Sequence, residues 1–93
     1  MQIFKYQLDL ADEQIVRMPR GAKILTVQMQ GFSPYLWAVV DITQPTEERW
    51  IATRGTGHMF EGDPGVYLGT VQLHNGLVFH VFDATGQGQN ANP

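Results

Sequence analysis

The dipeptide Asn75-Gly76 limits the fold of this chain more than any other feature, because it separates two mostly apolar runs, 66–74 and 77–83. A two-residue hairpin loop of type I′ needs positive φ at both central positions, which Asn and Gly tolerate better than other residues. The dipeptide therefore predicts an antiparallel β-hairpin closed by a tight turn. The two apolar runs are expected to be neighbouring strands.

The register of this hairpin follows from the length of its loop. With a two-residue loop, Leu73 pairs with Val78 and Val71 pairs with His80. His80 is then the single polar side chain on an apolar face. We expect a core histidine whose ring nitrogen meets a backbone carbonyl or a hydroxyl. His74 is expected on the opposite face.

Five further segments have the residue patterns of strands: 3–8, 14–16, 22–30, 35–40 and 50–54. In the third of these, Leu25, Val27 and Met29 alternate with polar residues. That alternation is typical of a strand with one face on the core and one face in water.

Residues 35–40 are all apolar and do not alternate. The run is short and rich in β-branched residues, which predicts a central strand covered on both faces. We assign Trp37 in this strand, and Phe79 in the hairpin, to the core. The MPRG sequence at 18–21 fits a type I turn between two strands, with Pro second and Gly fourth. Residues 44–48 contain a proline, which cannot donate to a strand ladder, and are expected to form a loop.

About seven short, mostly antiparallel strands spaced by turn signals predict an all-β fold. We expect a meander that forms a small barrel or a two-layer sandwich. The length suits one domain, 1–84. Residues 85–93 are polar and rich in Gly and Asn, and are expected to form a flexible tail.

Charged residues make up only 16% of the chain, against about 25% in an average soluble domain. Scarce charge and a core that is small for the length predict a homodimer or a higher closed oligomer. The net charge is −3 and the six basic residues are scattered, which argues against a nucleic-acid partner. There is no cysteine and no long apolar run, so we expect a soluble, cytoplasmic protein without disulfides or a membrane partner.

Residues 50–64 concentrate the side chains that are suited to binding. A strand over 50–54 places Trp50, Ala52 and Arg54 on one face. The following GTGH sequence has two glycines, which let consecutive N–H groups point at an anion. Arg54 would provide a fork of donors and a tryptophan ring would stack on a base, as in a site for a phosphate-bearing nucleotide. The residues expected to bind a ligand or a partner are Trp50, Arg54, Thr56, Gly57, His58 and Phe60.

Simpler interpretations of these residues remain open. The GTGH turn is also what an ordinary edge strand uses to end, with Thr56 bonded locally and His58 in solvent. A metal site would have to combine His58 with His74 and His80, whose spacing does not suit a metal, so no metal or cofactor is expected. General acid–base chemistry by Thr56 and His58, with Asp63 orienting the imidazole, is the arrangement that would make the protein an enzyme.

A protein partner requires less special geometry than a nucleotide. The chain has ten aromatic residues and four methionines, which serve as anchors at interfaces. An unpaired strand edge would offer a second mode of binding.

Six segments, IFKYQL, MPRGAKILTVQ, LWAVVD, ATRGTGH, YLGTVQLHNG and LVFHVF, resemble a small family of uncharacterised proteins encoded by phages and prophages. The resemblance spans residues 2–83. It implies a β-rich accessory protein of a phage, and such proteins often antagonise host defences by blocking a host protein or sequestering a nucleotide signal. The resemblance brings no catalytic motif.

Taken together, these observations predict a non-enzymatic binding protein that acts in the host cytoplasm. The alternatives are a small enzyme that degrades a nucleotide signal and a structural or virion accessory protein.

Overall fold

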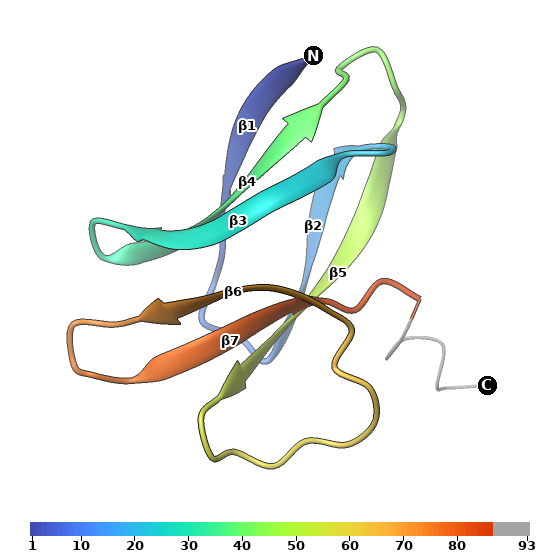
Figure 1. The fold of residues 1–93 in the computed structure, drawn as a ribbon. Helices are drawn as coiled ribbons and strands as arrows, with labels where there is room; N and C mark the ends of the chain where they lie inside the picture. Colours follow the sequence, from blue (N-terminus) through green and yellow to red (C-terminus); the bar gives the residue numbers. More distant parts are fainter. Residues whose placement is uncertain (87–93) are drawn as a thin grey trace.

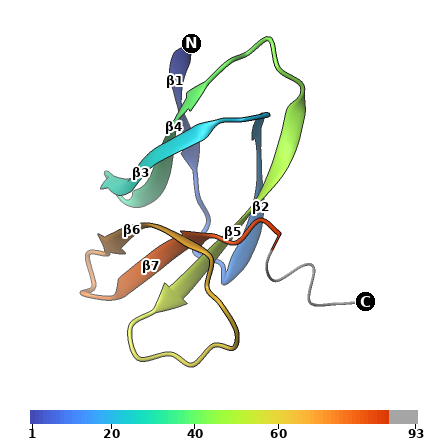
Figure 2. The same cartoon turned by 45° about the vertical axis from the view of Figure 1, so that its right-hand side comes forward.

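A computed structural model describes residues 1–86, which form seven strands in two antiparallel sheets (Figure 1). The strands are β1 (Gln2–Gln7), β2 (Glu13–Pro19), β3 (Lys23–Gln30), β4 (Ser33–Val40), β5 (Thr46–Gly55), β6 (Val66–Gln72) and β7 (Val78–Asp83). The predicted all-β class and the number of strands are confirmed. The two sheets are not closed into a barrel, so the two-layer arrangement is the one adopted (Figure 2). No helix among residues 1–86 is long and apolar enough to cross a membrane.

The smaller sheet has the order β1-β4-β3 and the larger sheet has the order β2-β5-β7-β6. Hairpins between consecutive strands occur at β3–β4 and at β6–β7. The other connections change sheet or skip a strand, so the chain departs from the expected simple meander. These connections place β5, which carries the candidate binding residues Trp50 and Arg54, in the middle of the larger sheet beside β7.

The turn after β2 shows how the chain changes sheet. The amide of Ala22 donates to the carbonyl oxygen of Pro19 at 3.1 Å, and Gly21 has a φ of 80°. Gly is therefore third in the turn, where a type II turn needs positive φ, and the predicted type I turn over 18–21 is wrong by one residue. β2 and β3, which this turn joins, lie in different sheets.

The core lies between the sheets and contains alternate residues of the strands. In β4, Leu36, Ala38 and Val40 are fully buried, whereas Trp37 faces outward and is half-buried. The expectation that β4 is covered on both faces, with Trp37 in the core, is therefore wrong. Phe79 packs against the core as predicted.

The faces of residues in β3 and the start of β5 also differ from the predictions. A bulge in β3 between Ile24 and Thr26 shifts the alternation by one residue. Ile24 therefore packs against the core, while Leu25 is left 47% exposed instead of joining Val27. Residues 46–48, expected in a loop, belong to β5 because they pair with β2, and only Gln44 and Pro45 of the expected loop precede the strand.

The β6–β7 hairpin has a three-residue loop. The amides of Leu73 and Gly76 donate to the carbonyl oxygens of Leu77 and Leu73, at 2.9 and 3.0 Å. Gly76 has a φ of 87°, but Asn75 has a negative φ, which matches a type I turn followed by a left-handed glycine rather than a type I′ turn.

The extra loop residue changes every pair in the hairpin. His80 pairs with Thr70 instead of Val71 and lies on the outer face of the larger sheet. The predicted register and the placement of His80 on the core face are therefore wrong, because a shift of one residue moves each side chain to the other face. The core face of the hairpin holds Val71 and Val81.

The end of the described chain is tied to the sheet. The hydroxyl of Thr85 accepts the amide of Trp50 at 2.9 Å and donates to Asp83 at 2.5 Å. The predicted tail begins at this residue, and residues 87–93 lie outside the described part of the structure.

Candidate functional site

The outer face of the larger sheet is built from alternate residues of β5 and β7. Ile51 and Thr53 lie on the core face, and Trp50, Ala52 and Arg54 lie on the other face, as the alternation predicted; Ala52 is nevertheless buried there. The register places Arg54 of β5 directly opposite His80 of β7.

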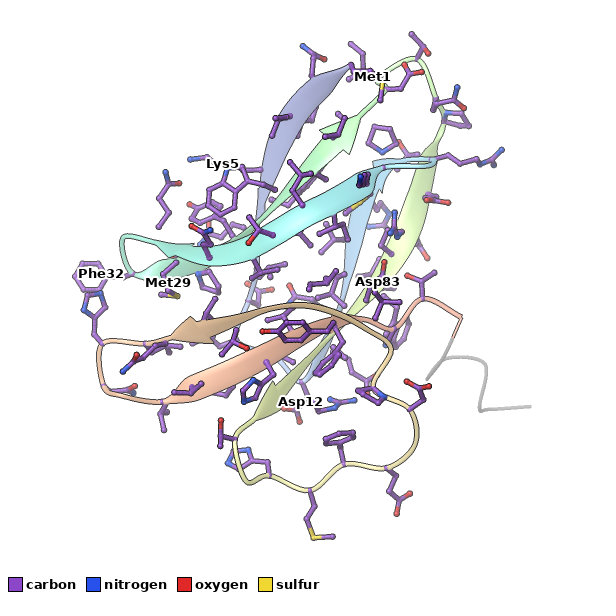
Figure 3. All side chains as sticks on the ribbon, in the orientation of Figure 1. Met1, Lys5, Asp12, Met29, Phe32 and Asp83 are labelled. Atoms are coloured by element: carbon purple, nitrogen blue, oxygen red, sulfur yellow. The ribbon has the colours of Figure 1, made fainter. Side chains whose placement is uncertain are left out.

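Arg54 is held by the fold rather than presented to solvent. Its Nη1 atom donates to the carbonyl oxygens of Asp12 and Thr53, at 3.1 and 3.3 Å. Its Nη2 atom lies 3.9 Å from a carboxylate oxygen of Glu13, and the ring of Phe60 lies 5.4 Å from the guanidinium carbon. The side chain is only 19% exposed. Its Nη1 atom is used by backbone oxygens, whereas its Nε atom is buried and has no hydrogen-bond partner among the described residues. Asp12, which is labelled in Figure 3, directly precedes β2, and its carbonyl oxygen also accepts the amide of Thr53 at 2.8 Å.

The GTGH sequence forms a turn whose amides are largely used internally. The amide of Thr56 donates to the carbonyl oxygen of Val78 at 3.2 Å, and the amide of His58 donates to that of Gly55 at 3.0 Å. Gly57 has a φ of 83°, as the third position of a type II turn requires. The expected row of N–H groups directed at an anion is therefore not formed.

The turn nevertheless lines a cavity of about 350 Å³. Thr56 and His58 form one wall, and the tip of the β6–β7 hairpin forms the other, with Gly76, Leu77, Val78 and Phe79. The sequence did not point to these hairpin residues, because they come from a strand two positions later in the chain.

The other predicted site residues lie away from this cavity. Trp50 is four residues from Arg54 along the strand, which is about 13 Å, and its Nε1 atom donates to Glu13 at 2.9 Å. Phe60 lies over Arg54. The predicted set is therefore divided between the cavity and the outer face of the sheet.

A chain of hydrogen bonds crosses that outer face. The ring of His80 joins the hydroxyls of Thr56 and Thr70, with Nε2 at 2.7 Å from the first and Nδ1 at 3.0 Å from the second. The hydroxyl of Tyr67 lies 2.5 Å from that of Thr70. His80, and not His58, is thus the histidine that meets Thr56.

This series of hydrogen bonds resembles the catalytic arrangement in which a base activates a hydroxyl and is oriented by a third group. The orienting group on Nδ1 is here the hydroxyl of Thr70 rather than a carboxylate. The expected link from Asp63 to His58 is absent from the described hydrogen bonds, where Asp63 instead accepts the amide of Gly65 at 2.8 Å. Only the correct register of β6 and β7 would have revealed the role of His80.

The three histidines contact different residues. His74 stacks on Phe32, with ring centroids 4.3 Å apart, at the tips of two hairpins (Figure 3). Within residues 1–86 there is no group of three or more acidic or histidine side chains that would hold a metal ion.

Exposed apolar side chains lie on the 56–65 loop, where Phe60 contacts Arg54, and on β6. Met59, which is 97% exposed, and Phe60 lie on the 56–65 loop. Tyr67 is 58% exposed and packs edge-on against Phe82, with ring centroids 5.7 Å apart. We call the surface formed by Arg54, Met59, Phe60, Tyr67 and Phe82 the aromatic surface.

Comparison with known proteins identifies one family. A family model described as Domain of unknown function (DUF7352) matches residues 1–92. No curated protein and no solved structure matches the chain. Because the family match spans nearly the whole sequence, the chain belongs to the DUF7352 family.

Proposed function

We propose that this protein acts by binding another protein through the aromatic surface, and that it is not an enzyme. The observation that carries the proposal is the exposure of Met59 and Tyr67, together with the packing of Phe60 over a partly covered arginine. Tyr, Phe, Met and Arg are enriched at interfaces, and a few such residues provide most of the binding energy.

Contacts and strand pairing connect Phe60 and Tyr67, which lie in the aromatic surface, through the outer face of the larger sheet. Phe60 lies over Arg54, which pairs with His80 across the sheet. His80 bonds Thr70, whose hydroxyl bonds Tyr67. A partner that covers Tyr67 and Phe60 would therefore bury one continuous patch with hydrogen-bonding groups at its centre.

The biological setting of the proposal rests on the sequence. The segments that resemble phage-encoded proteins support an accessory role in the cytoplasm of an infected host. The partner is then a component of a host defence system, which the protein blocks by occupying its surface.

Sequestration of a phosphate-bearing nucleotide is the second candidate. A volume of about 350 Å³ lies within the usual range of small-molecule sites, and Thr56 and His58 provide polar groups in the wall. This candidate is weaker because Arg54 already donates to Asp12 and Thr53, and the amides of Thr56 and His58 are engaged within the fold.

Affinity capture from infected cells tests the first candidate. A double variant, Met59→Ala with Tyr67→Ala, should lose the host protein that the wild type retains. Ile42→Ala is a matched control, because Ile42 is an exposed apolar residue on the β4–β5 connection. Equal recovery by wild type and double variant would reject the aromatic surface as the binding site.

A nucleotide panel separates the remaining possibilities. A sequestering protein returns its cyclic nucleotide intact after denaturation, whereas an enzyme returns a product. Turnover that disappears in Thr56→Val and in His80→Gln would overturn the non-enzymatic proposal. Intact release of a nucleotide, with no captured protein, would favour the second candidate.

A further inference from the structure

β1 is an open edge of the smaller sheet. In the sheet that the structure describes, β1 pairs with β4 and with no other strand (Figure 1). Apolar residues are exposed on both of its faces, Ile3 at 63% and Phe4 at 38%. An exposed edge with apolar side chains is a template for pairing with another strand.

The direction of the backbone groups of β1 follows from one hydrogen bond. The amide of Leu8 donates to the carbonyl oxygen of Pro34 at 2.9 Å, directly after the pair formed by Gln7 and Tyr35. Hydrogen-bonded and non-hydrogen-bonded pairs alternate in an antiparallel ladder, so Phe4 and Tyr6 are bonded to β4. The N–H and C=O groups of the alternate residues, Ile3, Lys5 and Gln7, consequently point to the open edge.

The charge of β1 does not guard this edge. An edge lysine usually discourages strand pairing. Here the Nζ atom of Lys5 reaches across β4, donates to Gln30 of β3 at 2.6 Å and lies 4.9 Å from the ring centroid of Tyr35. The single charged side chain of β1 is therefore drawn away from the open edge.

The other strands at sheet edges are better protected. β2 carries the charged residues Glu13 and Arg17 and ends in Pro19, which are features that prevent edge pairing. β3 lies close to β6, because a Cβ atom on Gly69 would come within 3.0 Å of the carbonyl oxygen of Val27.

We propose that two copies of this chain associate by antiparallel pairing of β1 with β1, with Phe4 facing Phe4 across a two-fold axis. The inference gives a surface to the homodimer expected from the composition, and it does not depend on the aromatic surface. The two smaller sheets would join into one sheet, in the order β3-β4-β1-β1-β4-β3.

The backbone and the side chains of β1 select this register. In a two-fold pair, residues that share a face must oppose each other, and the bonded pairs must come from the residues whose backbone groups point outward. Ile3 of one copy then exchanges both hydrogen bonds with Lys5 of the other copy, and the two Phe4 residues form the close, non-hydrogen-bonded pair. Of the two neighbouring allowed registers, one would place Lys5 opposite Lys5, and like charges directly opposite are destabilising. The other would place Ile3 opposite Ile3 and would pair only residues 2–4 of β1, whereas the selected register pairs residues 2–6.

The occupant that fits best is therefore a second copy. In the selected register, opposed residues of β1 are Gln2 with Tyr6, Ile3 with Lys5, and Phe4 with itself, and no pair carries two like charges. Such self-complementarity is what a closed two-fold interface requires.

Single-cysteine variants test the pairing, because the natural chain contains no cysteine. In the proposed dimer the two Cα atoms of residue 4 are about 4.5 Å apart, which lies within the range of a disulfide. Under mild oxidation Phe4→Cys should form a covalent dimer, whereas Ile3→Cys and Lys5→Cys should not. A covalent dimer of Ile3→Cys or of Lys5→Cys instead of Phe4→Cys would overturn the register, and a wild-type protein that sediments as a monomer at micromolar concentration would overturn the dimer.

The introduction of a charged side chain at residue 4 provides a second test without oxidation. Phe4→Lys and Phe4→Glu should each raise the dimer dissociation constant by about tenfold or more, because like charges meet at the axis. An equimolar mixture of the two variants should recover the dimer in sedimentation experiments. Failure of the mixture to recover it, while both variants keep the melting temperature of the wild type, would contradict the proposed axis.

Ile42→Lys, an exposed change elsewhere, is the matched control and should leave the dimer unchanged. The dimer is also expected to be independent of partner binding. Phe4→Lys should retain the captured host protein, and the double variant of Met59 and Tyr67 should retain the dimer. Loss of the dimer in that double variant would contradict pairing through β1.

Discussion

The Nε2 atom of His80 lies 2.7 Å from the hydroxyl oxygen of Thr56, so the imidazole that meets the GTGH turn comes from β7 and not from the turn itself. His58, two residues beyond Thr56, packs its ring against Gly55 instead. Two residues of the GTGH turn therefore contact different histidines: Thr56 contacts His80, and Gly55 contacts His58. One lies on the outer face of the larger sheet, and the other lines the neighbouring cavity.

Arg49→Ala should lower the free energy of unfolding far more than the removal of an exposed arginine does. The Arg49 guanidinium donates to Asp83 at 2.6 and 3.1 Å and to the carbonyl oxygen of Ala22 at 2.9 Å. Its side chain is only 16% exposed, and removal of one partner from a buried ion pair costs about 3–5 kcal/mol. Denaturant titration should show a loss in that range.

The matched control for this prediction is Arg17→Ala. Arg17 bonds Glu48 at 2.8 Å, but both side chains are more than half exposed. Exposed pairs contribute less than about 1 kcal/mol. Similar losses for the two variants would show that Arg49 and Asp83 do not stabilise the fold as a buried pair.

Acid should weaken the fold through Asp83. Burial pushes the pKa of Asp83 upward, but hydrogen bonds from Thr85 and from Arg49 outweigh burial and hold the pKa below its ordinary value. A carboxyl group with a lowered folded-state pKa contributes stability above its unfolded pKa, which is about 3.9 for aspartate. That contribution should disappear as the pH falls below about 4 and through the folded-state pKa. Asp83→Asn should reduce the unfolding free energy at pH 7 and flatten this acid limb, and an unchanged limb would exclude Asp83 as its source.

Arg54→Ala should destabilise the fold, because the Arg54 side chain is largely covered and its guanidinium bonds to the backbone. The change removes the bond to Asp12 and the contact with Phe60. One hydrogen bond to a charged group contributes about 1.5–3 kcal/mol. We expect a comparable loss of unfolding free energy, together with faster proteolysis within residues 56–65.

Arg20→Ala provides the comparison for Arg54, because the side chain of Arg20 is exposed. Changes at such positions usually stay within about 0.5 kcal/mol. If Arg54→Ala matched Arg20→Ala in both stability and proteolysis, Arg54 would have no structural role. That result would favour the expectation from the sequence that its guanidinium binds a ligand.

Gly55→Ala should move the imidazole of His58 and change little else. A Cβ atom at residue 55 would lie 2.6 Å from Nδ1 of His58, which is the end of a flexible side chain and can rotate away. The NMR signals of His58 should shift, with a stability change within about 0.5 kcal/mol.

Gly65→Ala is the contrasting glycine substitution. Its Cβ atom would lie 2.4 Å from the carbonyl oxygen of Asp83, and Gly65 has a φ of 103°. Strain of this kind costs about 1–3 kcal/mol. Equal stability of the two glycine variants would contradict the close approach of residue 65 to the end of β7.

The sequence by itself determined the class of the fold and much of its local structure. Alternation correctly assigned the faces of residues 50–54, and the apolar run at 35–40 correctly marked a central strand. These features are local, because the side chains of a strand alternate with a period of two wherever the strand lies. Gly21 and Gly76 likewise marked turns, since positive φ is a property of single residues.

Tertiary structure decided which strands pair and in which register. Asn75-Gly76 fits either a two-residue loop or a longer loop with a left-handed glycine, and only packing of Val71 and Val81 into the core selects the second. That choice turned His80 outward to Thr56 and Thr70.

The surroundings of the arginines were also decided by contacts that are distant in sequence. Arg54 bonds Asp12 across 42 residues, and Arg49 bonds Asp83 across 34. An arginine in a strand looks the same in the sequence whether its guanidinium meets solvent, a ligand or a buried carboxylate. The free energy of each outcome depends on groups that the chain brings together only when the two sheets pack.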